Sequence, residues 1–117
     1  MNKYQAASSP AFILEEKLLR KNLERLQLVQ QKAGVSIILA LKAFALWRVF
    51  PIVAEYLSGA TASSLHEARL IYEEMGKKAH TYTVAYHPTH FQEILNYSSH
   101  LSFNSVQQYE QYQSQIR

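Results

Sequence analysis

The sequence has 117 residues, of which 48% are hydrophobic, enough for one ordinary domain with a buried core. The formal net charge is +3, but the densest basic cluster, at 17–25, shares its segment with Glu15, Glu16 and Glu24, as a solvated helix face does. No cysteine occurs, which excludes disulfides, thiolate nucleophiles and cysteine-based zinc sites.

The apolar runs are much shorter than the roughly 20 residues that a membrane-spanning helix needs. The first residues, MNKYQAASSPAF, also lack the apolar stretch of a signal peptide. These features predict a cytoplasmic protein with neither nucleic acid nor a membrane as its partner.

In the first half of the chain we expect an extended piece at 11–14, a helix, a strand and a second helix. Leu19, Leu23, Leu26 and either Val29 or Gln30 recur at helical spacing and form one apolar face. Gly34 stands where a C-terminal helix cap belongs. The aliphatic, β-branched run 35–41 predicts a buried strand, and 47–57, with Pro51 near its start, predicts the second helix.

The second half repeats this alternation. Strands are expected at 59–62, 80–85 and 100–103, and helices at 64–76, 88–97 and 106–116. Strand ends near Lys42, Ala62, Ala85 and Asn104 recur about every twenty residues, which is typical of parallel βα units. Four units suit half of an eight-unit barrel or a doubly wound sheet. No Gly-x-Gly-x-x-Gly turn follows a strand, which weakens the dinucleotide-binding alternative.

A lysine closes the most apolar strand. Alternation puts Ser36, Ile38, Ala40 and Lys42 on one side and Ile37, Leu39 and Leu41 on the other. We expect the bulky set to face helices, and Lys42 to point into a barrel at the C-terminal end of its strand, where barrel enzymes place their chemistry. Partial desolvation there favours the neutral amine, which attacks aldehydes to form a Schiff base. A snorkelling lysine at the end of a strand is the alternative interpretation.

Several stretches resemble the carboxynorspermidine decarboxylases. They are SPAFILEEKLLRKNLERL, ILALKAFA, GATASSLHEARL, IYEEMGKKAHTYTVAY and HLSFNS. These enzymes are a branch of the pyridoxal-phosphate decarboxylases with an alanine-racemase-type barrel. The resemblance implies an α/β fold, the N-terminal half of a (βα)8 TIM-type barrel with about four βα units. The wider family usually has asparagine two residues after the lysine, and Phe44 stands there instead, which favours the carboxynorspermidine branch.

The resemblance also implies a site and a reaction. Lys42 would be the catalytic lysine that carries pyridoxal phosphate, with Ala40, Ser64 and Glu67 near the cofactor. The implied reaction converts carboxynorspermidine or carboxyspermidine to norspermidine or spermidine and carbon dioxide. A capping box at the start of the following helix is the alternative explanation of Ser64 and Glu67.

The same resemblance implies two regions, an N-terminal extended segment and helix at 1–34 and a partial cofactor-binding barrel at 35–117. The second barrel half, the phosphate-binding loop, the acidic partner of the pyridine nitrogen and the C-terminal β-domain are expected to be absent. The chain is therefore interpreted as an N-terminal fragment, inactive alone, of an enzyme that forms homodimers. The alternative is a non-catalytic half-barrel that associates with other chains.

Two further signals carry no function. His87 and His90 are three residues apart, but zinc needs more ligands, so no metal is expected. The eight tyrosines and five phenylalanines are scattered through core-like positions and do not line a basic groove.

Overall fold

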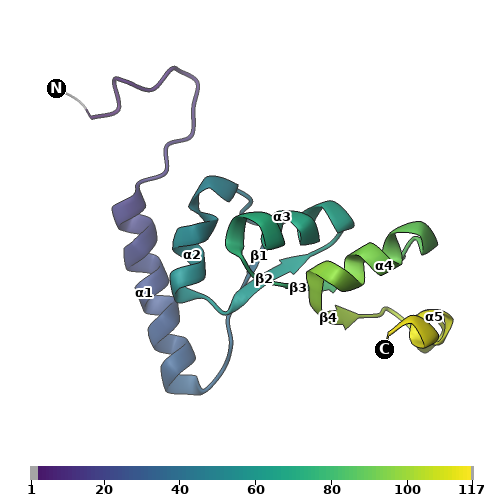
Figure 1. Ribbon diagram of the computed structural model, residues 1–117. Coiled ribbons are helices and arrows are strands. Elements are labelled where there is room, and N and C mark those ends of the chain that lie inside the picture. The colour runs from purple at the N-terminus through teal and green to yellow at the C-terminus, as the bar shows by residue number, and fades with distance from the viewer. Residues whose placement is uncertain (1–2, 117) are drawn as a thin grey trace.

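The computed structural model describes residues 3–116, which form helices packed beside one sheet (Figure 1). The helices are α1 (Glu16–Ala33), α2 (Phe50–Tyr56), α3 (Leu65–Met75), α4 (Pro88–Tyr97) and α5 (Val106–Tyr112). The strands are β1 (Ile38–Ala40), β2 (Gly59–Ala62), β3 (Ala79–Tyr82) and β4 (Ser98–Ser102). Short 3-10 turns at Trp47–Val49 and Gln113–Gln115 precede α2 and follow α5.

The four strands are all parallel and lie in chain order, β1-β2-β3-β4. Ile38 pairs with Gly59, Thr61 with His80, and Tyr82 with Ser102. Each strand is followed by a helix before the next strand begins, as βα units require. The predicted α/β architecture with four parallel βα units is confirmed.

Two strands, β1 and β3, are shorter than the sequence pattern predicts, whereas β2 has the predicted bounds. β1 has three residues, not the seven of the apolar run, and β3 ends at Tyr82 rather than at residue 85. Immediately after β1 a tight turn forms, because the carbonyl of Ala40 accepts hydrogen bonds from the Ala43 and Phe44 amides at 3.0 and 3.1 Å. Lys42 therefore lies inside this turn and not on the strand itself.

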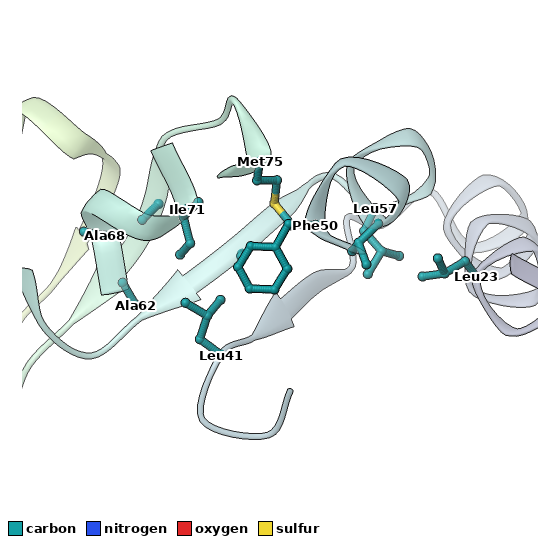
Figure 2. Close-up of a cluster of buried hydrophobic side chains, with 11 residues drawn as sticks. Leu23, Leu41, Phe50, Leu57, Ala62, Ala68, Ile71 and Met75 are labelled. Carbon is teal, nitrogen blue, oxygen red and sulfur yellow. The ribbon is translucent and has the colours of Figure 1, made fainter. Parts of the chain in front are cut away.

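The main core lies between the sheet and helices α2 and α3 (Figure 2). Phe50, Ala68 and Ile71 are fully enclosed, with an exposed fraction of 0% each. Leu41 is buried in the same cluster, and Ile37 and Leu39 pack against it. The bulky side of the first strand thus faces the helices, as predicted. Burial of each large apolar side chain stabilises the fold by about 1.5–3 kcal/mol.

A second core cluster joins α4, α5 and the end of β4. The rings of Phe91 and Tyr112 stack with centroids 4.1 Å apart. The Tyr86 hydroxyl donates to the carbonyls of Thr81 and Ser102 at 3.1 and 2.8 Å, and the Tyr112 hydroxyl donates to the Tyr86 carbonyl. Burial of the Tyr86 hydroxyl raises its pKa above the ordinary value of 10.0.

Helix α1 packs against α2 along a narrower face than its apolar spacing predicts. Leu23 is buried, and Leu19 packs on the core, but Leu26 and Val29 are 39% and 50% exposed. At the last position of this face, the polar side chain of Gln30 joins α1 to the end of α2 and to the segment before β1. Gln30 donates to the Tyr56 carbonyl and accepts from the amide of Ile37 at 2.8 and 2.7 Å. The helix that this spacing predicts is confirmed, but Leu26 and Val29 lie largely outside its buried face.

Candidate active site

One face of the sheet carries no helix among residues 3–116, and we call it the open face. Its side chains alternate with the helix-facing core residues Ala60, Ala62 and Ala79. It is lined at the C-terminal strand ends by Ile38, Thr61, His80, Tyr82 and Ser102. This face is polar, which suits the binding of a polar ligand better than packing against another apolar layer.

The open face contains a hollow of ≈ 210 Å³ at the C-terminal ends of the strands. Lys42 lines it together with the open-face side chains just named, with Ala62 and with Ser63. The Nε2 atom of His80 lies 3.2 Å from Ser102 Oγ, which orients the imidazole across two neighbouring strands. The hollow thus combines one amine, four hydroxyls and one imidazole with small apolar groups.

Lys42 lies at this hollow and is exposed. We expected the Lys42 amine to be partly desolvated, and among residues 3–116 it is not. In this part of the chain no second layer covers the open face. Shelter at the end of a barrel strand comes from the opposite strands and loops, which lie far away in sequence. The amine is therefore accessible to a ligand from solution.

The other three predicted cofactor residues do not line the hollow. Ala40 is half-buried at the end of β1, two residues before Lys42. Ser64 caps α3, because its Oγ accepts from the Glu67 amide at 3.2 Å. The Glu67 carboxylate reaches back to Ser63, accepting from its amide and its hydroxyl at 2.6 and 2.8 Å. Capping accounts for both residues, with Ser63 in place of Ser64 as the partner of the carboxylate.

Sequence reasoning missed Thr61, Ser63, His80, Tyr82 and Ser102. The sequence carries a signal for four of them, because alternation along β2, β3 and β4 puts Thr61, His80, Tyr82 and Ser102 on one face. The strand registers place Thr61 beside His80 and Tyr82 beside Ser102.

The described residues contain two pairs of stacked or neighbouring histidine rings. The rings of His80 and His100 stack on neighbouring strands with centroids 5.1 Å apart, and only His80 lines the hollow. His87 and His90 lie at the start of α4. Residues 3–116 contain no group of three or more side chains suited to hold a metal ion. The same residues include no helix that is both long and apolar enough to span a membrane.

Four parallel βα units in chain order, with a lysine just after the first strand, have the arrangement of part of a βα-barrel. The chain is homologous to the carboxynorspermidine decarboxylases. It is 45% identical over 114 residues to the carboxynorspermidine/carboxyspermidine decarboxylase of Campylobacter jejuni, covering 97% of this chain and 30% of that enzyme. The crystal structure of carboxynorspermidine decarboxylase from the same organism, complexed with norspermidine, superposes with a TM-score of 0.91 at 44% identity. That match covers 94% of this chain and 30% of the solved one.

Two other relatives extend the comparison. The carboxyaminopropylagmatine decarboxylase of Synechocystis sp. is 45% identical over 109 residues, which are 93% of this chain and 28% of that enzyme. The carboxynorspermidine/carboxyspermidine decarboxylase of Herminiimonas arsenicoxydans is 33% identical over 107 residues. No protein-family model matches the chain. The chain spans less than a third of the length of the curated relatives it matches, and the resemblance inferred from its motifs is confirmed.

Proposed function

We propose that this chain is the lysine-bearing part of a pyridoxal-phosphate-dependent decarboxylase of polyamine biosynthesis. The substrate would be carboxynorspermidine or carboxyspermidine and the products norspermidine or spermidine and carbon dioxide. The observation that carries the proposal is the position of Lys42, at the hollow beyond β1, in a chain similar along nearly its whole length to such enzymes.

The donor set of the hollow fits the cofactor. An accessible amine at Lys42 can condense with an aldehyde, and hydroxyls from Thr61 and Ser102 offer hydrogen bonds to polar ring substituents. Bound pyridoxal phosphate supplies an electron sink for the charge left when the substrate's carboxylate departs as carbon dioxide and a proton takes its place.

Several side chains of the hollow then have separate roles. Lys42 provides the nucleophilic nitrogen and holds or releases a proton at that atom. Thr61 on β2 and Ser102 on β4 orient the ligand from the two sides of β3, and Ile38 restricts water on the apolar side. Ala40, Ser64 and Glu67 remain predicted neighbours of the cofactor, and Glu67 reaches the hollow through Ser63.

The proposal is tested by covalent capture at one lysine. The 117-residue chain is mixed with pyridoxal phosphate, reduced with borohydride and digested, and the modified peptides are mapped by mass spectrometry. We expect the modification at Lys42 and its loss in Lys42→Ala. Lys78→Ala is the matched control, because Lys78 is an exposed lysine near the N-terminal strand ends of the same face. Equal labelling of every exposed lysine would overturn the assignment.

A second candidate function is favoured by the open face and by the exposure of Lys42. In that case the chain is a non-catalytic half-barrel that associates with other chains. The reaction described above needs groups that the relatives carry outside the matched region, so we expect no decarboxylation by this chain alone. Release of carbon dioxide from carboxynorspermidine by the purified chain would contradict that expectation. The homodimer, the cytoplasmic location and the absence of nucleic-acid and membrane partners stay predictions.

A further inference from the structure

The turn between β2 and α3 connects the hollow to a carboxylate behind it. Ser63 is the residue that lines the hollow, and Glu67 lies one helical turn further on, half-buried at the start of α3. A single carboxylate oxygen of Glu67 accepts from the Ser63 amide at 2.6 Å and from the Ser63 hydroxyl at 2.8 Å. Hydrogen bonds to an ionised acceptor are roughly twice as strong as neutral ones.

This arrangement fixes the direction of the Ser63 hydroxyl. A serine hydroxyl has one proton and two lone pairs, and here the proton is committed to Glu67. The amide proton of Ser63 is committed to the same oxygen. Both donors of Ser63 are therefore used, and Ser63 Oγ can only accept a hydrogen bond from a group in the hollow.

We propose that Glu67 is a positioning residue that presents Ser63 Oγ as a hydrogen-bond acceptor for a protonated amine of the substrate. The inference rests on the proposed function, since it assigns an amine-recognising group to that site. The proposed substrates carry several ammonium groups at neutral pH, and an ammonium group only donates hydrogen bonds, so an oriented acceptor suits these groups better than it suits a carboxylate or a phosphate. It also reassigns Glu67 from a cofactor contact to a residue that acts through Ser63.

The first test follows the Ser63 amide, independently of any ligand. Amide hydrogen exchange is measured by NMR in the wild-type chain and in Glu67→Ala, Glu67→Gln and Ser64→Ala. We expect Glu67→Ala to speed exchange at Ser63 roughly ten- to hundredfold, the effect of losing one hydrogen bond to a charged group. Ser64→Ala is the matched control, because it removes the other capping bond of the same helix end and leaves Ser63 bonded to Glu67.

The second test uses norspermidine as the probe, with binding followed by the amide shifts of Thr61 and Ser63. We expect Glu67→Ala and Ser63→Ala to weaken binding several-fold, and Glu67→Gln, whose side-chain oxygen still accepts from Ser63, to restore most of it. Should Glu67→Gln bind as weakly as Glu67→Ala, the charge itself attracts the amine, and the positioning role is overturned.

The remaining outcomes are also decisive. Equal exchange at Ser63 in Glu67→Ala and Ser64→Ala would overturn the role of Glu67, even if binding changed. Absence of norspermidine binding by the wild-type chain would overturn recognition of the amine by Ser63. Capture of pyridoxal phosphate at Lys42 tests the proposed function separately, so either idea can fail without the other.

Discussion

At the scale of single residues, Tyr86 connects the neighbouring strands β3 and β4. Its hydroxyl donates to the carbonyls of Thr81 on β3 and Ser102 on β4, both near the level of the hollow. Burial raises the pKa of this hydroxyl, so the folded chain favours its neutral form. Tyr86 therefore stabilises the strand ends that carry the open-face residues His80 and Ser102.

We predict that Tyr86→Phe lowers the free energy of unfolding by about 1–2 kcal/mol near neutral pH, because two buried carbonyls lose their donor. The contribution of Tyr86 is complete below the ordinary tyrosine pKa of 10.0 and is lost as pH rises through the raised value. The stability difference between wild type and variant should therefore shrink above that pH. Urea unfolding at several pH values measures it.

Tyr72→Phe serves as the control, since Tyr72 is 48% exposed on α3. It should change stability little at any pH. The difference in free energy of unfolding between wild type and Tyr86→Phe could also stay constant through the alkaline range. That result would contradict the assigned role of burial in the Tyr86 pKa.

At the scale of elements, several helix ends and the strand β2 could be predicted from sequence, and the lengths of β1 and β3 could not. Gly34 ends α1 with φ of 65°, a left-handed conformation that glycine adopts without strain. Ser64 caps α3, and Pro88 opens α4, as predicted. These signals act within one turn of chain. A parallel strand instead ends where its partner's hydrogen bonds end, so the apolar run 35–41 yields a strand only at Ile38–Ala40.

The connection of α1 to the sheet depends on Gln30. We predict that Gln30→Ala lowers the free energy of unfolding by about 2–3 kcal/mol, because the Ile37 amide and the Tyr56 carbonyl lose their partner in a partly buried position. Gln31→Ala, at an exposed neighbouring position, should cost much less. Equal midpoints of urea unfolding for the two variants would show that the connection contributes nothing.

At the scale of the whole molecule, the sheet is covered on one side only. In the described residues β1 and β4 each pair with a single neighbour, so each leaves an unpaired outer edge. Parallel sheets are normally covered on both faces, and free edges invite pairing with another chain. The same openness explains why Lys42 is exposed and why the hollow is shallow.

We predict that the isolated chain associates as its concentration rises, through the strand edges and the open face. Light scattering over a concentration series should give an average mass above that of one chain, and the thermal transition should be broad. A monomer at every concentration with a sharp, cooperative transition would contradict this prediction. Such a result would also weaken the second candidate function.

The alternation of the apolar run predicted Lys42 as a strand residue, whereas Lys42 lies in the turn after β1 and is exposed. Shelter depends on which segments lie opposite, and no local pattern carries that information. The hydrogen bonds of Ser63 could not be predicted, because the capping-box spacing points to its neighbour Ser64. The Ser64-to-Glu67 spacing matches a capping box, and the neighbouring serine four residues before Glu67 is the actual partner of the carboxylate.

The strict order of the strands has a consequence for how the chain acquires its structure. Every ladder joins segments that are consecutive along the polypeptide, so each new pairing closes only a short loop and costs little chain entropy. The sheet can grow by one unit at a time while the polypeptide is still being synthesised, starting from the amino end. Each completed unit then serves as the template for the next.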